Sequence, residues 1–290
     1  MKKVSEGIYN LRCPYCGDSR KSLKKARGYI YFKKGNWHYY CHNCGIYKPY
    51  EIFSIENSNL RIDKNIKIEN QEIKNNVKSF LKSVLKLDKE HPAIKYLEKR
   101  KIPIERWDEI YYCANPLYPK NKFIYSPSIA FVNEENGLPS SIIFRAIDDN
   151  SNLKHFCFNI IEETKPYNFY KVNKNKKIYI VEGIIDSLFF DNSVSILGIN
   201  KINTATELIN YDHVIIFDNE PHKKETIKAY QKAINMGFNV FIWPSEISLE
   251  IKDINDFILA GYSKEELIKM IYENTYSGLS AKLRLTKFKV

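Results

Sequence analysis

Short apolar runs alternate with longer amphipathic stretches in the carboxyl-terminal part of the chain, and this alternation constrains the fold more than any other feature. The runs KKIYIVEG, SVSILG, HVIIFD and NVFIWP have the length and the apolar, β-branched content of buried strands. Helices are predicted from Ile184, near 203–210, over 221–236 and from Asp253. This order is typical of a parallel sheet with helices on its faces, where ligands bind at the carboxyl ends of the strands.

Acidic side chains follow the ends of three of these strands. Asp218 and Glu220 come directly after one buried run, and their spacing of two would point both to the same side of a continued strand. Glu182 ends a second strand, and Asp253 follows a third. Gathered acids repel one another unless divalent cations neutralise them, and oxygen ligands suit Mg²⁺ or Mn²⁺ better than zinc. The pattern therefore predicts a metal site suited to phosphoryl transfer.

Further residues extend this acidic pattern. Gly183 permits a tight turn from strand into helix, and Asp186, one turn further on, leans back towards Glu182. Asn255 and Asp256 accompany the third acidic group, in IKDINDF. Glu182 taken alone is equally well explained as a helix cap, but that explanation does not extend to three acidic groups in the same topological position.

Four of the six cysteines form two close pairs, in CPYCG and CHNCG, with 24 residues between Cys16 and Cys41. Each Cys-x-x-Cys-Gly predicts a tight knuckle, and four thiolates close a tetrahedral structural zinc site without a position for water. The predicted ligands are Cys13, Cys16, Cys41 and Cys44. Two disulfides are the alternative, which a reducing compartment disfavours. His38 and His42 lie nearby but are not needed as ligands, and Cys113 and Cys157 are interpreted as ordinary thiols.

Basic charge is concentrated around the cysteine pairs. Residues 1–50 carry 11 basic and 2 acidic side chains, whereas the net charge of the whole chain is +11. The segment between the pairs predicts a hairpin that interleaves aromatic rings with cations, which suits stacking on bases and pairing with phosphates of a single strand. The candidate residues are Tyr29, Tyr31, Trp37, Tyr39, Lys24, Lys25, Arg27, Lys33 and Lys34. The alternatives are that some of the rings cover the small core of the module and that the charges serve only solubility.

The middle of the chain is less regular. Residues 55–75 are polar, lack an apolar period and predict a linker. Apolar spacing predicts a helix from Val77 to Leu87, and another begins at Pro92. Short alternating runs with turn signals predict an antiparallel sheet over 123–160. The basic tail SAKLRLTKFKV is interpreted as a partner-docking segment or as a last core strand.

Several motifs are absent from the sequence. No apolar segment follows the first lysines, and no run of about eighteen apolar residues occurs. These features predict a cytoplasmic protein without a membrane span. No G-x-x-x-x-G-K-[ST] phosphate loop is present, which disfavours a nucleotide-driven motor in this chain.

The order Glu-Gly, then Asp-x-Glu, then Lys-Asp-x-Asn resembles the toprim domain that DnaG-type primases, topoisomerases and some nucleases share. A four-cysteine ribbon followed by a linker, a mixed sheet with a basic strand and this domain resembles a bacterial or phage primase. CPYCGDSRKSLKKARGYIYF and YYCHNCG resemble the T-even-type phage primases in particular. The resemblance covers nearly the whole chain. It implies an α/β fold, with an α+β catalytic core built on the toprim parallel sheet, plus an N-terminal zinc ribbon.

The resemblance also implies a division into domains. The predicted regions are a zinc-ribbon template-binding domain at 1–54, a linker at 55–75, the N-terminal subdomain of an RNA polymerase core at 76–172, and a toprim catalytic subdomain with C-terminal helices at 173–290.

Carried over position by position, the resemblance implies roles for the acids. Glu182 would assist the attacking 3′-hydroxyl or position metal. Asp218, Glu220 and Asp253 would hold catalytic Mg²⁺ or Mn²⁺, with Asp186 in a supporting role.

The resemblance assigns two basic residues as well, and the chain departs from the family at two positions. Arg145 matches a basic residue in the strand before toprim and would contact nucleotide or template phosphates, with Lys171 as a weaker candidate. Glu220 replaces the commoner second Asp, and Asn255 stands where many cellular primases have an Asp.

The predicted function is synthesis of short RNA primers from ribonucleoside triphosphates on single-stranded DNA during replication, by metal-dependent nucleotidyl transfer with release of pyrophosphate. The family implies a separate replicative helicase as partner. One alternative is a toprim nuclease or topoisomerase, although a topoisomerase needs a further domain with a strand-cleaving tyrosine. The other is a non-catalytic single-strand-binding or loading factor, against which the three intact acidic groups argue.

Overall fold

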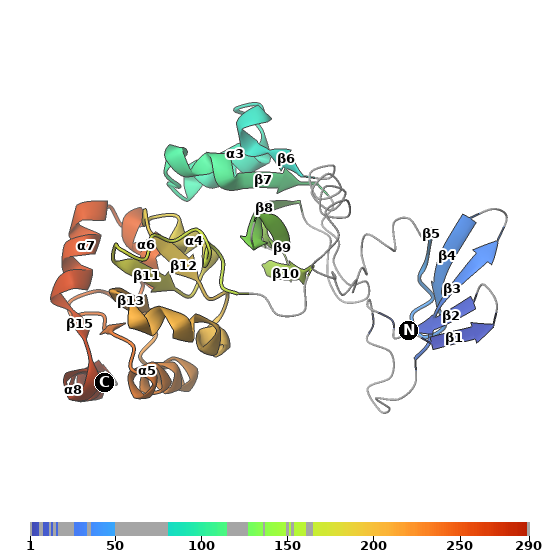
Figure 1. Cartoon of the computed structure of the whole chain (residues 1–290). Helices are drawn as coiled ribbons and strands as arrows, with labels where there is room; N and C mark the ends of the chain where they lie inside the picture. Colours follow the sequence, from blue (N-terminus) through green and yellow to red (C-terminus); the bar gives the residue numbers. More distant parts are fainter. Residues whose placement is uncertain are drawn as a thin grey trace. The chain divides into compact units, whose positions relative to one another are not determined.

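The computed structural model describes residues 2–5, 8–11, 13, 16, 26–33, 36–49, 81–114, 127–135, 137–148, 151, 154–160 and 165–288. Two compact units emerge from its internal contacts. The first comprises Met1–Lys82, Tyr111–Val132 and Leu138–Glu162, and the second comprises Ser83–Ile110, Asn133–Gly137 and Glu163–Val290. The described part contains three five-stranded sheets (Figure 1). The linker predicted at 55–75 lies outside the described residues.

The amino-terminal sheet has the strand order β1-β2-β3-β4-β5 and is antiparallel throughout. Its strands are β1 Lys2–Ser5, β2 Ile8–Leu11, β3 Gly28–Lys33, β4 Asn36–Cys41 and β5 Tyr47–Pro49. The predicted hairpin is confirmed as β3 and β4, with Ile30 opposite Tyr39. These two residues pack with Cys13, Cys41 and Ile46 into a small core. So small a core is of the kind that a bound metal commonly stabilises.

The middle sheet has the strand order β10-β9-β8-β7-β6. Its strands are β6 Lys82–Ser83, β7 Ile110–Cys113, β8 Ser128–Glu135, β9 Leu138–Ala146 and β10 His155–Asn159. Strands β9 and β10 pair antiparallel, with Arg145 opposite His155. Leu81, Cys113, Ala130, Ile142 and Phe144 form a buried cluster. Cys113 is therefore a core residue of this sheet.

The helix predicted from Val77 to Leu87 is wrong over its described part. Lys82–Ser83 is the edge strand β6, and Val84–Lys86 makes a single 3₁₀ turn, η1, in which Val84 is fully buried. Pairing at a sheet edge outweighs the helical spacing here, because tertiary packing overrides local propensity.

The helix predicted at Pro92 is confirmed as α3, Pro92–Lys99. The proline occupies the first turn, where its missing N–H costs nothing, and His91 Nδ1 accepts the Ala93 N–H at 3.1 Å. A 3₁₀ helix, η2 (Ile104–Glu109), follows.

The carboxyl-terminal sheet has the strand order β12-β11-β13-β14-β15. Its strands are β11 Ile178–Val181, β12 Ser193–Ser195, β13 His213–Ile216, β14 Val240–Phe241 and β15 Thr275–Tyr276. The first four are parallel, which confirms the predicted parallel sheet, and β15 adds an antiparallel edge that the sequence reasoning missed. Figure 1 shows this sheet among its helices.

Helical segments connect and cover these strands. They are α4 Ile184–Ser187, η3 Ile199–Asn210, α5 Lys224–Met236, α6 Ile254–Leu259, α7 Lys264–Glu273 and α8 Gly278–Phe288. The tail is helix α8, with Ala281 and Leu285 buried, so the alternative of a last core strand is wrong. None of the helices in the described ranges is both long and apolar enough to cross a membrane.

Candidate active site and zinc site

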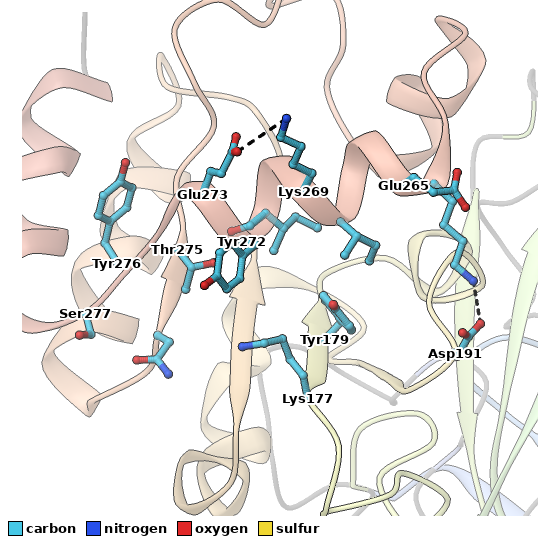
Figure 2. Close-up of a pocket in the computed structure, with 14 residues that line it drawn as sticks. Lys177, Tyr179, Asp191, Glu265, Lys269, Tyr272, Glu273, Thr275, Tyr276 and Ser277 are labelled. Atoms are coloured by element: carbon cyan, nitrogen blue, oxygen red, sulfur yellow. Dashed lines mark hydrogen bonds and ion pairs between the residues drawn. The ribbon is translucent and has the colours of Figure 1, made fainter.

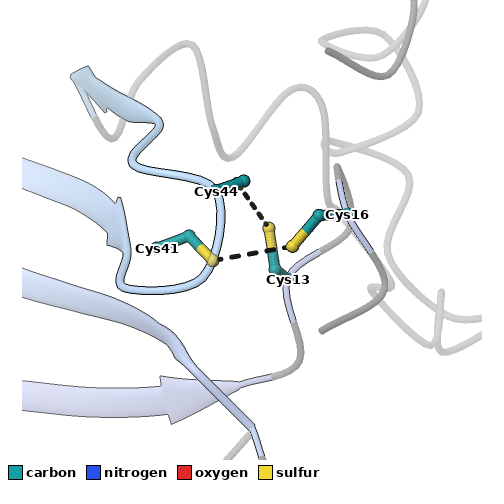
Figure 3. Close-up of side chains that lie close together, drawn as sticks. All are labelled: Cys13, Cys16, Cys41 and Cys44. Atoms are coloured by element: carbon teal, nitrogen blue, oxygen red, sulfur yellow. Dashed lines mark hydrogen bonds between the residues drawn. The ribbon is translucent and has the colours of Figure 1, made fainter. Parts of the chain in front are cut away.

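Four cysteine sulfurs meet beside the amino-terminal sheet (Figure 3). All four Sγ atoms lie within 4.8 Å of one another, with Cys13 Sγ 3.7 Å from Cys44 Sγ and Cys16 Sγ 3.8 Å from Cys41 Sγ. A disulfide would join sulfurs at about 2.05 Å. The four cysteines are free thiols, so the disulfide alternative does not hold.

The sulfur spacing fits a tetrahedral zinc ion. Zn–S bonds of about 2.3 Å place tetrahedral sulfurs about 3.8 Å apart. Asn43 supports the charge of the cluster, because its backbone N–H donates to Cys41 Sγ at 3.3 Å and its Nδ2 donates to Cys16 Sγ at 3.4 Å. Burial raises the pKa of the Cys13 thiol and, to about 11, that of the Cys44 thiol. A cation in the cluster would reverse this effect of burial.

Aromatic rings cover the face of this sheet opposite Ile30 and Tyr39. Since side chains alternate along a strand, this face carries Tyr29, Tyr31, His38, Tyr40 and Tyr47, here called the aromatic face. His38 stacks on Tyr47 with ring centres 5.3 Å apart, and Tyr47 Oη lies 2.7 Å from His38 Nδ1. The Tyr31 ring lies 5.9 Å from the same imidazole. The sequence reasoning missed His38, Tyr40 and Tyr47 for this face, although strand alternation identifies them.

Tyr39 requires a correction. It is 0% exposed in the ribbon core, and a Cβ at Gly28 would lie 2.6 Å from its hydroxyl, so the close approach requires a glycine there. Its ring cannot stack on a base, and the alternative of a core role holds at this position. Arg27 is half-buried. Lys24, Lys25 and Lys34, and the side chains of Lys33 and Trp37, lie outside the described residues.

The predicted acids lie at the carboxyl edge of the parallel sheet. Strands β11 and β13 are neighbours, with Val181 opposite Ile216, so Glu182 and Asp218 follow adjacent strand ends. Asn219 connects this edge to the third acidic group. Its backbone N–H donates to the Lys252 carbonyl at 2.6 Å, which holds the residue before Asp253 against the loop of Asp218.

The acids at this edge raise one another's pKa values. Burial, reinforced by Glu182, Asp253 and Glu220, raises the pKa of Asp218 to about 8. Burial also raises the pKa of Glu182, although the Ile199 N–H donates to Glu182 Oε1 at 3.2 Å. The edge therefore carries more negative charge than its protein neighbours neutralise.

The remaining groups at the edge are one acid and one cation. Asp186 is buried in α4, and burial, followed by Asp253 and Asp218, raises its pKa well above the ordinary range. Lys223 Nζ pairs with Glu220 at 2.6 Å and is half-exposed. The carboxylates do not form a compact cage: among the described side chains, only the four cysteines are grouped closely enough to hold a single ion.

Gly183 is required beside Asp186. A Cβ at this position would lie 2.4 Å from Asp186 Oδ2, closer than real Cβ atoms approach a neighbour. The predicted tight turn from strand into helix is present between β11 and α4, and it brings the backbone of Gly183 directly over the buried Asp186 carboxylate.

The two basic residues carried over from the family lie apart from these acids in the sequence. Arg145 is half-buried in β9. Lys171 Nζ lies 3.3 Å from a Glu134 carboxylate oxygen, so its charge is engaged.

A cavity of about 1120 Å³ lies away from the acidic edge (Figure 2). Its lining comes from α7, β15 and residues such as Lys177, Tyr179 and Asn239, which lie at the amino ends of β11 and β14. Its charges are balanced, since Lys264 pairs with Asp191 at 2.7 Å and Lys269 with Glu273 at 4.0 Å. None of the acids at the carboxyl edge lines this cavity.

Comparison with known proteins yields both a fold and a family. No protein-family model matches the chain. The zinc-binding and RNA polymerase domains of the Aquifex aeolicus primase superpose with a TM-score of 0.53 at 18% identity, over 94% of this chain and 80% of that one. The RNA polymerase domain of Mycobacterium tuberculosis primase DnaG gives 0.50 at 12% identity, over 72% and 84%. The DNA primase of Enterobacteria phage T4 is 30% identical over 96% of this chain and 89% of its own length.

The fold is that of the zinc-binding and RNA polymerase domains of primases, and the four cysteines are grouped as a zinc site requires. The sequence similarity then identifies the family: the chain belongs to the DNA primases. It is accordingly a nucleotidyltransferase whose reaction is the synthesis of RNA primers for DNA replication.

Proposed function

We propose that primer synthesis takes place at the carboxyl edge of the parallel sheet. In this proposal Asp218, Glu220 and Asp253 bind Mg²⁺ or Mn²⁺, while Glu182 positions metal or assists the attacking 3′-hydroxyl. When bound, the divalent ions supply the positive charge that activates the hydroxyl and stabilises the pyrophosphate leaving group. The observation that carries the proposal is the raised pKa of Asp218, about 8, caused by burial among other acids at a parallel-sheet edge.

The chain's own residues fit hard divalent ions. Every proposed ligand is a carboxylate, the donor that Mg²⁺ and Mn²⁺ prefer. Lys223 pairs with Glu220 and faces the field of Asp218, yet one exposed ammonium does not balance four acids. The negative charge of these acids would attract cations, and it would repel an anionic ligand such as a triphosphate that has no bound metal ion.

The aromatic face is the proposed contact for the single-stranded DNA template. Its rings are partly exposed, with Tyr47 at 53%, and the basic residues of the first fifty positions would pair with phosphates. Arg145 and Lys171 are proposed to contact phosphates of template or nucleotide. The proposed division of labour keeps the predicted boundaries of 1–54 for the ribbon, 55–75 for the linker, 76–172 for the first part of the polymerase core and 173–290 for the catalytic part.

The proposal also names the substrates, a protein partner and the cellular compartment. The substrates are ribonucleoside triphosphates, and a separate replicative helicase is the proposed partner. The reaction would proceed in the cytoplasm where DNA is copied, which is the host cytoplasm if a phage encodes the chain.

The test is primer synthesis on a mixed-sequence single-stranded DNA with labelled ribonucleotides and Mg²⁺ or Mn²⁺. Asp218→Asn is expected to reduce synthesis roughly a hundredfold or more, with zinc content and template binding unchanged. Asp212→Asn is the matched control, because Asp212 precedes the same strand at its opposite end and pairs there with Lys177 at 2.7 Å. Near-normal synthesis by Asp218→Asn would overturn the assignment, and metal-dependent loss of the template would favour a nuclease.

A further inference from the structure

Asn255 is engaged with a distant part of the chain. It lies in the first turn of α6, two residues after Asp253, and is 1% exposed. Its Nδ2 donates to the Arg100 carbonyl at 2.8 Å, while its Oδ1 accepts from Arg100 Nη1 at 2.9 Å. Arg100 is the C-cap residue of α3. Two bonds thus join the end of α3 to the start of α6.

This pair requires an amide. The Arg100 carbonyl needs a donor and its guanidinium needs an acceptor, and an amide offers both. A carboxylate at position 255 would keep the guanidinium bond but would place an acceptor against the Arg100 carbonyl. The amide of Asn255 is therefore matched to Arg100 rather than to a metal ion, which explains a position where the family resemblance expects an Asp.

The backbone of Asn255 reaches the acidic edge. Its N–H donates to Asp186 Oδ1 at 3.1 Å, so the buried acid of α4 is held by the first turn of α6. Asp253 is the N-cap of that same turn, and its Oδ1 accepts the Asp256 N–H at 2.7 Å. One buried residue thus contacts α3, holds Asp186 and lies within the turn that sets the direction of the Asp253 carboxylate.

We propose that Arg100 and Asn255 form a positioning pair that orients Asp253 and Asp186 for metal binding, and that Asn255 is not itself a ligand. The inference rests on the proposed function, since it takes Asp253 as a metal ligand. It adds α3 to the support of the active site, although α3 lies more than 70 residues before the first strand of the parallel sheet in the sequence.

The two roles of Asn255 predict opposite results for Asn255→Asp. If position 255 were a ligand, an added carboxylate would tighten Mn²⁺ binding. If it is the positioning residue, the Asp carboxylate is repelled by the Arg100 carbonyl and displaces the first turn of α6, which holds Asp253 and Asp186, so Mn²⁺ binding weakens. The substitution preserves volume, so it leaves no cavity in the core.

The experiment measures Mn²⁺ affinity by electron paramagnetic resonance on the full chain with zinc retained, together with kcat and template KM. Asn255→Asp and Arg100→Gln are expected to weaken Mn²⁺ binding about 10- to 100-fold, the usual cost of losing a residue that orients a ligand. We expect kcat to fall while template KM stays unchanged, and Arg100→Lys to recover part of the loss. Circular dichroism verifies that each variant is folded.

Lys101→Ala is the matched control. Lys101 Nζ donates to the Ile258 carbonyl at 3.4 Å, so it joins the same end of α3 to the same helix without touching Asn255 or Asp186. Its Mn²⁺ affinity should equal that of the wild type. An equal loss in this variant would mean that general docking of α3 is responsible, and the positioning role would be abandoned.

Asp253→Asn separates this inference from the function on which it rests. If Asp253→Asn weakens Mn²⁺ binding and Asn255→Asp leaves it equal or tighter, the positioning pair is overturned and the active-site proposal stands. If Asp253→Asn leaves Mn²⁺ binding unchanged, both are overturned.

Discussion

The cysteine cluster and the acidic edge are built in opposite ways. The four sulfurs come from two knuckles and are already spaced as a tetrahedral zinc ion requires, beside a sheet with a core of very few residues. The acids come from three strand ends of a well-packed sheet, and among the described side chains no three carboxylates are grouped closely enough for one ion. In the ribbon, a bound metal would stabilise the folded state. The carboxyl-terminal sheet has a core of its own, and repulsion among the acids at its edge lowers the stability of the folded state.

The largest expected effect comes from breaking the cysteine site. Cys41→Ser should release zinc, because three sulfurs no longer close the tetrahedron and zinc binding is part of the folding free energy of so small a module. We expect start-site choice on the template to disappear and primer yield to fall roughly a hundredfold. Metal analysis and primer sequencing measure both effects.

Cys157→Ser is the control for this substitution. Cys157 is half-buried in β10, outside the cluster, and should retain zinc and template preference. A Cys41→Ser protein that keeps the wild-type start sites would contradict a reading role for the ribbon.

A smaller effect is expected at the acidic edge from Gly183→Ala. The backbone at this position, with φ −90° and ψ 149°, accepts alanine, so the cost arises only from the new Cβ meeting Asp186 Oδ2. We expect a loss of about 10- to 100-fold in Mn²⁺ affinity and kcat, with zinc content unchanged. Combining it with Asp186→Ala should give a loss smaller than the sum of the two, since the clash is then removed. Strict additivity would argue against this contact.

Features set by local spacing could be predicted from the sequence, whereas contacts between distant residues could not. The cysteine ligands and the hairpin follow from local spacing, and the strands with their terminal acids follow from apolar runs and their order. The Arg100–Asn255 pair joins residues 155 positions apart, so no local pattern contains it. Lys82–Ser83 lies within a stretch of helical apolar spacing but pairs at a sheet edge. The apolar residues of the tail are compatible with both a strand and a helix, and the structure forms helix α8. Tyr39 was misjudged because core and surface rings alternate within one strand.

The aromatic face offers a milder test on the ribbon side. Tyr31→Ala should weaken binding of single-stranded DNA about five- to tenfold, the low end of what one stacked base contributes, because its ring is half-buried. Fluorescence anisotropy with a labelled oligonucleotide measures this loss. Tyr272→Ala is the control, since Tyr272 is 79% exposed on α7 and belongs to neither the ribbon sheet nor the acidic edge. Equal effects of the two substitutions would remove the aromatic face from template binding.

The smallest expected effect concerns the stability of the folded protein. Substituting Asp218 should raise this stability, whereas substituting Cys41 should lower it. The pKa of Asp218 lies at about 8 in the folded protein instead of the ordinary 3.8, so the folded state holds a proton that the unfolded state has released. Stability therefore falls as the pH rises from about 4 towards 8 when no divalent cation is added. Asp218→Asn stays neutral throughout and should be more stable than the wild type at pH 8, by several degrees in Tm, and nearly equal at pH 4.

Thermal unfolding at several pH values, with zinc retained and without added Mg²⁺ or Mn²⁺, measures this difference. Added Mn²⁺ should raise the Tm of the wild type at pH 8 more than that of Asp218→Asn, because binding to the folded state adds stability only where the ligands are present. Cys41→Ser should instead be less stable than the wild type at every pH. A gain for Asp218→Asn that does not grow with pH would show that the charge of Asp218 does not oppose the fold, and the contrast between the two sites would then be lost.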